Sequence, residues 1–227
     1  MRQTWILLCL FSSTALFAQD NTLGVEPTVF DVTITNVTKN QIFSPPIAVT
    51  HNSDLSLFTP GYPASGALAT MAEDGDAGPL KEDVLANESA FFATISEGPL
   101  LPGQSVTLKV ETYGMYNRIS VLGMLVTTND AFFAARGIQV PRTVYVKRAP
   151  APISVTANVY DAGSEANTED CAHIPGPPCG NGCVRVTDGA EGYVHIHNGV
   201  HGIGSIDAAS YDWRNPGAVI TVKLSKD

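Results

Sequence analysis

The feature that most constrains the fold is an eight-residue run at 119–126, ISVLGMLV, which is apolar at almost every position. A strand that is buried on both faces has this composition, whereas a half-buried strand alternates apolar and polar residues. Residues 29–37 show that alternation. We therefore expect the run to form the central strand of a β-rich core and residues 29–37 to form a half-buried strand.

The overall composition favours an all-β fold with one or two short helices. The chain has 20 glycines and 15 prolines, and only 15% of its residues are charged; this is typical of short elements joined by turns. Further strands are expected at 47–50, 91–95, 105–111, 143–147, 153–160, 193–197 and 218–224. Helices are expected at 65–72, with its first residue as the N-cap, and at 80–86. The acidic residues after the first helix, Glu73, Asp74 and Asp76, are interpreted as a solvated turn.

The N-terminus is typical of an exported protein. Residues 1–18 combine one positive charge, an apolar stretch and a small-residue cleavage pattern, which predicts a signal peptide. Their apolar stretch is shorter than the ~20 residues that span a bilayer. Residues 19–27 are expected to be a flexible leader, and residues 28–224 one domain that carries a Cys-, Gly- and Pro-rich loop insertion at 168–190. We expect a secreted or extracellular protein, periplasmic or on the cell surface if the source is bacterial.

Three cysteines remain once residues 1–18 are removed, and all three lie in the loop insertion: Cys171, Cys179 and Cys183. Disulfides form in exported proteins, so we expect one local bridge and one free thiol. The spacing does not select the pair. The alternative is a zinc site that these cysteines form with His173, although the spacing matches no standard zinc motif.

The charge and motif content excludes several classes of function. The net charge of −9 argues against nucleic acid or an anionic membrane as a partner, because both require a basic surface. The sequence contains no G-x-S-x-G motif, and no Gly-rich loop links an expected strand to a helix. We therefore expect a protein without catalytic activity or membrane insertion, whose partner is an extracellular protein or a glycan.

Acidic side chains follow two of the expected strands. Asp130 comes shortly after the 119–126 run, and Asp161 ends the 153–160 strand and brackets an Ala-Gly-Ser turn with Glu165. Strand ends hold side chains in fixed positions, and carboxylate oxygens are the ligands that calcium prefers. From these residues alone two interpretations stay open: a calcium site at one end of the sheet, or solvated turn acids that never meet.

A second group of candidate ligands is the histidines near the C-terminus. His195 and His197 would share one face of a strand, and a turn at Asn198 and Gly199 could fold His201 over them. Such a cluster suits copper or zinc. The other interpretation is a hydrogen-bonded, metal-free pair. An exported transition-metal protein or enzyme that uses these three histidines is therefore the alternative function.

Four segments, taken in order, carry a resemblance to a known family. They are the helix and acidic turn at 65–75, NDAFF at 129–133, YDAGSE at 160–165 and DWRNP at 212–216. Together they resemble the spondin domain, the extracellular module of F-spondin and mindin, and its bacterial relatives in particular. The resemblance implies an antiparallel β-sandwich related to C2 domains. It also implies one calcium ion at an edge of the sandwich, no catalysis and a role in adhesion.

The resemblance also implies which residues hold the ion. Asp130 takes the place of the acid before the family's aromatic pair, and Asp161 and Glu165 take the places of the acids in its Asp-Ala-Gly-x-Asp element. Glu165 departs from the family's aspartate, but the flexible oxygen shell of calcium accepts either side chain. The thrombospondin repeats and cysteine pattern of the animal members are absent. The resulting expectation is a secreted calcium-binding recognition or adhesion module.

Overall fold

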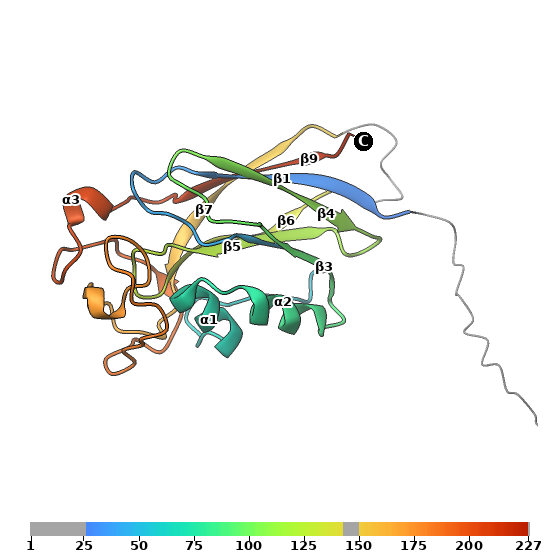
Figure 1. The fold of residues 1–227 in the computed structure, drawn as a ribbon. Coiled ribbons are helices and arrows are strands. Elements are labelled where there is room, and N and C mark those ends of the chain that lie inside the picture. The colour runs from blue at the N-terminus through green and yellow to red at the C-terminus, as the bar shows by residue number, and fades with distance from the viewer. Residues whose placement is uncertain (1–25, 143–149, 227) are drawn as a thin grey trace, which may run out of the picture.

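The computed structural model describes residues 26–142 and 150–226, and they are built mostly of antiparallel strands (Figure 1). The strands are β1 (Thr28–Asn36), β2 (Ile47–His51), β3 (Ala90–Ile95), β4 (Ser105–Thr112), β5 (Arg118–Met124), β6 (Ala131–Gln139), β7 (Ile153–Asp161), β8 (His195–Ile196) and β9 (Ala218–Leu224). The helices are α1 (Gly66–Asp74), α2 (Gly78–Leu85) and α3 (Ala208–Tyr211), with a 3-10 turn at Cys171–His173. The predicted all-β fold with a few short helices is confirmed.

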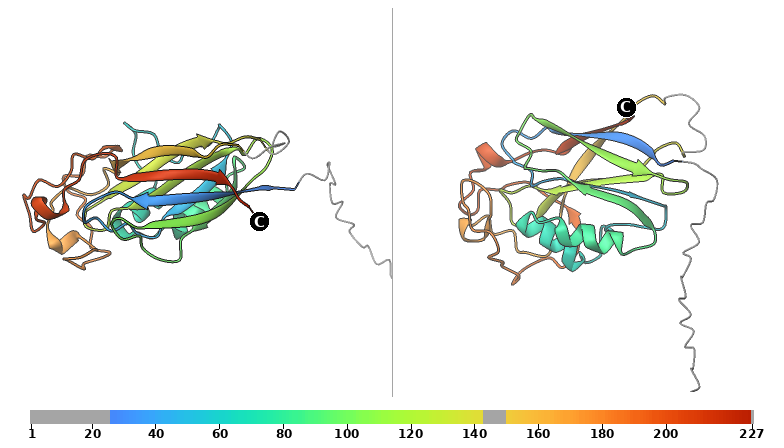
Figure 2. Two further views of the ribbon diagram at one scale, coloured as in Figure 1. Left: turned by 90° about the horizontal axis from the view of Figure 1, so that it is seen from above. Right: turned by 45° about the vertical axis from the view of Figure 1, so that its right-hand side comes forward.

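The strands form one continuous, nearly closed sheet. Its order is β3-β2-β5-β6-β7-β9-β1-β4, and β8 pairs with β7. Strand β7 joins the two layers, because residues 153–157 pair with β9 whereas residues 158–161 pair with β6. Figures 1 and 2 show the two layers stacked, with α1 and α2 beneath one of them. The sheet therefore passes from one layer to the other in the middle of β7, between Ala157 and Asn158, and the end of β7 at Asp161 lies in the layer of β6.

Two hydrophobic cores meet at β5. Val121 packs into the core between the two layers, and Leu122 packs into the core between the helices and the sheet. In β6, Phe133 and Phe132 divide in the same way. Successive residues of a strand point to opposite faces of the sheet. Both faces of β5 are therefore covered. The expectation that the 119–126 run is buried on both faces is confirmed.

The two predicted helices are present. Ser65 caps α1, and its hydroxyl oxygen accepts a hydrogen bond from the Leu68 N–H at 3.2 Å. The helix ends at Gly75, whose φ of 73° favours glycine. A side chain at Gly75 would also meet the Cβ of Ser44 at 2.8 Å. Helix α1 therefore has a defined cap at each end, and its C-terminal end packs closely on Ser44.

The acidic turn after α1 differs from the prediction. Glu73 is only 4% exposed, and its Oε2 lies 2.5 Å from the Nε of Arg185. Arg185 also donates to Asp74, at 2.7 Å. The interpretation of these acids as a solvated turn is wrong for Glu73, because a cation from the distant 168–190 loop reaches it.

Two strands differ from the expectations, and some expected segments lie outside the described residues. Strand β6 was not predicted, because its first five residues, AFFAA, are all buried and show no alternation. The strand expected at 193–197 is reduced to β8. The expected signal peptide at 1–18, most of the leader at 19–27 and the strand expected at 143–147 lie outside the described residues. Across residues 26–142 and 150–226, no helix has the length and apolar character needed to cross a membrane.

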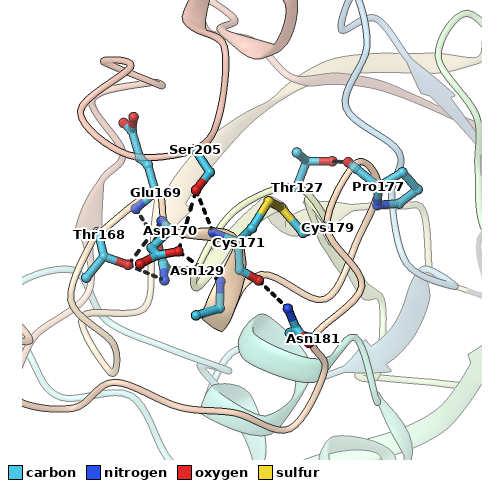
Figure 3. The surroundings of a disulfide bond; sticks show 11 residues. Thr127, Asn129, Thr168, Glu169, Asp170, Cys171, Pro177, Cys179, Asn181 and Ser205 are labelled. Carbon is cyan, nitrogen blue, oxygen red and sulfur yellow. Dashed lines mark hydrogen bonds between the residues drawn. A yellow bond between two sulfur atoms is a disulfide. The ribbon is translucent and has the colours of Figure 1, made fainter.

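The loop insertion is tied together by one disulfide, between Cys171 and Cys179 (Figure 3). Cys183 is free and exposed. The predicted local bridge with one odd thiol is confirmed, and the bridged sulfurs are not available to zinc. The Asn181 side chain donates to the carbonyl of Cys171 at 2.6 Å. The Cys171 N–H donates to the hydroxyl of Ser205 at 3.2 Å. Figures 1 and 2 show that the insertion and α3 gather at one end of the sandwich, away from the C-terminus.

Candidate metal centre

Strand pairing brings Asp130 and Asp161 together. Asp161 is the last residue of β7, and its partner across the sheet is Ala131, the first residue of β6. Asp130 immediately precedes that residue, and its carbonyl accepts the Ala162 N–H at 3.2 Å. The exposed fractions of Asp130 and Asp161 are 0% and 1%. These two predicted ligands therefore meet as buried carboxylates at the loop end of the sandwich.

One oxygen of Asp130 is held by the protein and the other is not. Oδ2 accepts the backbone N–H groups of Ser164 and Glu165, at 2.8 and 3.0 Å. Oδ1 is buried and has no hydrogen-bond partner among the described residues. A buried acceptor without a partner costs about 1–3 kcal/mol, and more when it is charged. The arrangement leaves Oδ1 available to a ligand.

Asp161 is held from both sides of its carboxylate. Oδ1 accepts the Gly163 N–H at 2.7 Å, and Oδ2 accepts the side-chain amide of Asn167 at 2.7 Å. Across the sheet, Asp161 pairs with His195 of β8, whose Nδ1 lies 4.0 Å from Oδ1. This Nδ1 is also buried and has no hydrogen-bond partner in the described part of the chain.

Asp161, Glu191 and His195 form a group that could hold a metal ion, since one ligand atom from each lies within 4.8 Å of the other two. Ligands on opposite sides of a calcium ion stand about 4.6–5.2 Å apart, given bonds of about 2.3–2.6 Å. Glu191 is not predicted from the sequence, because the chain turns at Gly192, where φ is 79°, and no periodic pattern marks this residue. The Asn167 amide also contacts Glu191, at 3.1 Å.

Glu165, the third predicted ligand, is placed differently. Its backbone N–H bonds Asp130, but its Oε1 accepts the Val186 N–H at 2.8 Å. Burial raises the pKa of Glu165 to about 7, and the negative charge of Glu73 adds to the shift. Its carboxylate therefore anchors the loop insertion and lies outside the group that converges on Asp161.

Without a metal ion, the ionised forms of Asp130 and Asp161 are electrostatically unfavourable. Burial and the negative charge of Asp161 together raise the pKa of Asp130 to about 7. Burial also raises the pKa of Asp161, to about 6, with a contribution from Glu191. Desolvation and like charges both disfavour ionised carboxylates. A divalent cation would reverse this effect, because its own charge dominates the local field.

The three candidate histidines do not converge. Burial lowers the pKa of His197 to about 3, so its ring is neutral. Both of its nitrogens are engaged, because Nδ1 accepts the Gly199 N–H at 2.9 Å and Nε2 lies 3.2 Å from the Asn167 carbonyl oxygen. The Nδ1 of His201 lies 3.7 Å from Glu169. Of the three, His195 alone belongs to the metal-competent group.

Residues 191–195 carry Glu191 and His195 and are called the strap. The strap crosses the turn that follows β7 and contains Gly163, called the β7 turn. The Gly192 N–H donates to the Gly163 carbonyl at 2.8 Å, and the Val194 N–H donates to the Tyr62 carbonyl at 2.9 Å. Gly163 has a φ of 65°, and a Cβ at this position would lie 2.3 Å from the Tyr193 carbonyl oxygen. Only glycine therefore allows the strap to lie this close to Asp161.

Comparisons with known proteins assign no family. No protein-family model matches the chain, and no curated protein matches it either. The resemblance to the spondin domain is therefore carried by the quoted sequence segments and stays a prediction.

Proposed function

We propose that the chain is a secreted, non-catalytic calcium-binding module for recognition or adhesion. In this proposal one ion lies among Asp130, Asp161 and Glu191, beside His195, and fixes the strap and the β7 turn at the loop end of the sandwich. The observation that carries the proposal is the buried, unpartnered Oδ1 of Asp130 next to a second buried carboxylate. The resemblance to the spondin domain supports the same ion and the same role.

The donor set fits calcium. Calcium takes six to eight oxygen ligands in a flexible geometry, and three carboxylates supply oxygens from separate elements. Carboxylate-rich sites favour calcium, magnesium or manganese over copper and zinc. The Asn167 side chain contributes from outside the shell, because its amide group holds Asp161 and Glu191 and its carbonyl oxygen faces His197.

One observation favours a transition metal as the second candidate. The unpartnered Nδ1 of His195 belongs to the metal-competent group, and imidazole nitrogen with two carboxylates suits zinc or manganese. This candidate replaces the three-histidine site with a site of Asp161, Glu191 and His195.

Thermal melting of metal-free protein separates the two candidates. We expect Ca²⁺ to raise the melting temperature and His195→Gln to retain most of that rise, because His195 supplies only one nitrogen to a shell of oxygens. A rise with Zn²⁺ or Mn²⁺ alone, lost in His195→Gln, would establish the transition-metal site instead. If none of the three ions changed the melting curve, both candidates would be wrong.

The calcium response is expected to increase with pH. The pKa of Asp130 is raised to about 7 and that of Asp161 to about 6, against about 3.9 in an unfolded chain. The folded metal-free protein thus holds these protons more tightly, so this contribution to stability is complete below about pH 4 and is lost as the pH rises to about 7. Calcium binds the ionised carboxylates and offsets that loss.

The measurement is the difference between melting temperatures with calcium and with chelator, taken at several pH values. It is expected to be small near pH 5 and largest near pH 8. The difference is needed because buried His197, with a pKa of about 3, lowers the stability as the pH falls below about 6.5. A calcium response of the same size at both pH values would contradict the assignment of buried carboxylates as ligands.

A further inference from the structure

Tyr193 stands beside the outer side of the proposed ion site. Its side chain belongs to the strap and is 44% exposed. Its ring meets the His195 ring edge-on, with centroids 5.4 Å apart and an interplanar angle of 86°. Nothing in the proposed calcium site requires an aromatic residue here. An exposed ring next to a metal-competent group is therefore a feature that the ion alone does not explain.

The proposed ion site combines buried and exposed residues. Asp161 is buried, Glu191 is exposed, and the His195 side chain is 25% exposed. The side chains proposed as ligands are those of Asp161, Glu191 and His195, which form the metal-competent group, together with the neighbouring Asp130. Calcium takes six to eight ligands, so with one ligand atom from each side chain about two to four positions remain for water or for a ligand from solvent. A ligand from solvent would reach them beside Glu191, the exposed member of the group, which shares the strap with Tyr193.

The charges at the site restrict what such a ligand can be. Three ionised carboxylates carry one more negative charge than a calcium ion neutralises. A phosphate or carboxylate ligand would add like charge to a site that is already negative, which is unfavourable. A neutral ligand that coordinates through hydroxyl oxygens adds no charge. The geometry thus suits a ligand with hydroxyl groups for the ion and an apolar face for the ring.

We propose that Tyr193 and the ion together bind a neutral glycan. This proposal rests on the calcium site proposed above. Adjacent sugar hydroxyls replace water on the ion, and the C–H face of the same sugar packs on the Tyr193 ring. A few placed polar groups beside an aromatic surface are typical of small-ligand sites. Tyr62, which is 65% exposed on the loop that bonds the strap at Val194, extends the surface available to a second sugar.

A glycan fits this surface better than a protein does. A stable protein interface buries about 800 Å² on each partner, and its energy is concentrated in a central cluster of aromatic anchors. The strap contributes Tyr193 as an exposed large apolar side chain, and Ile196 directly follows the strap. One ring beside an ion suits a single sugar unit.

The test is binding of the whole protein to an array of neutral and acidic glycans, with calcium and with chelator. We expect calcium-dependent binding to neutral glycans. Tyr193→Ala should weaken it about tenfold, as loss of a central aromatic contact does at other binding sites, while its calcium-induced rise in melting temperature is retained. Met115→Ala is the control, because it truncates an exposed side chain in the β4–β5 turn and should bind as the wild type does.

The outcomes separate this proposal from the one on which it rests. If calcium raises the melting temperature but no neutral glycan binds, the glycan proposal is wrong and a protein becomes the partner to seek. Binding that survives chelator, that is confined to acidic glycans, or that is unchanged in Tyr193→Ala would also overturn it. If calcium does not raise the melting temperature at all, the calcium site fails, and the glycan proposal fails with it.

Discussion

Calcium is expected to raise the melting temperature of the wild-type protein by about 5–10 °C, and Asp161→Asn is expected to remove this rise. An ion at one hundred times its dissociation constant adds about 2.7 kcal/mol to the stability, and each kcal/mol is worth about 2–4 °C for a domain of this size. Asp161 lies at the centre of the group and is 1% exposed. In Asp161→Asn the charged carboxylate is replaced by a neutral amide, and no other side chain takes its place as a proposed ligand. Differential scanning calorimetry with calcium and with chelator measures the effect.

Asp130→Asn provides an independent check. The amide oxygen still accepts the N–H groups of Ser164 and Glu165, so the turn keeps its hydrogen bonds while the ligand oxygen Oδ1 is lost. Asp83→Asn is the matched control, because Asp83 is exposed on α2, and it should leave the calcium response unchanged. A full calcium response in both Asp130→Asn and Asp161→Asn would contradict the proposed site.

Gly163→Ala is expected to destabilise the protein by about 2–5 kcal/mol and to remove the calcium response. The φ of Gly163 is 65°, and a left-handed backbone costs a non-glycine residue about 1–2 kcal/mol. The added Cβ would lie 2.3 Å from the Tyr193 carbonyl oxygen and 2.7 Å from its nitrogen. Backbone atoms cannot move aside by changing rotamer, so a further cost of about 1–3 kcal/mol is expected. The strap would shift and carry Glu191 and His195 away from Asp161.

Gly103→Ala isolates the backbone part of that effect, so the difference between the two variants gives the steric part. Gly103 has a φ of 74°, and nothing lies within 4 Å of a Cβ built there. This variant should lose only the backbone cost, about 1–2 kcal/mol, and should keep its calcium response. Urea unfolding gives the stabilities, and melting with and without calcium gives the response. Equal losses of stability in the two variants, with the calcium response kept in both, would show that the close contact between the strap and the β7 turn is not needed for the site.

The core and two of the proposed ligands could be predicted from the sequence because both depend on local patterns. The apolar run at 119–126 identified β5, and the acids at two strand ends identified Asp130 and Asp161. Strand β6 was missed because its buried residues include alanines that carry no β signal. Strand pairing then placed Asp130 beside Asp161, which no spacing in the sequence could specify.

The rest of the site depends on long-range contacts. Glu191 reaches Asp161 only because Gly163 lets the strap lie close to the β7 turn. Glu165 is drawn to the loop insertion by the Val186 N–H. In the same way, Glu73 is buried because Arg185 reaches it from the other half of the chain. Such partners are determined by the folded chain and have no local sequence signal.

Equilibrium dialysis of the metal-free protein against radioactive calcium tests the central claim most directly. The account predicts saturable binding of one calcium ion per chain, lost in Asp161→Asn and retained in Asp83→Asn. The absence of saturable binding by the wild type, or equal binding by Asp161→Asn, would contradict it.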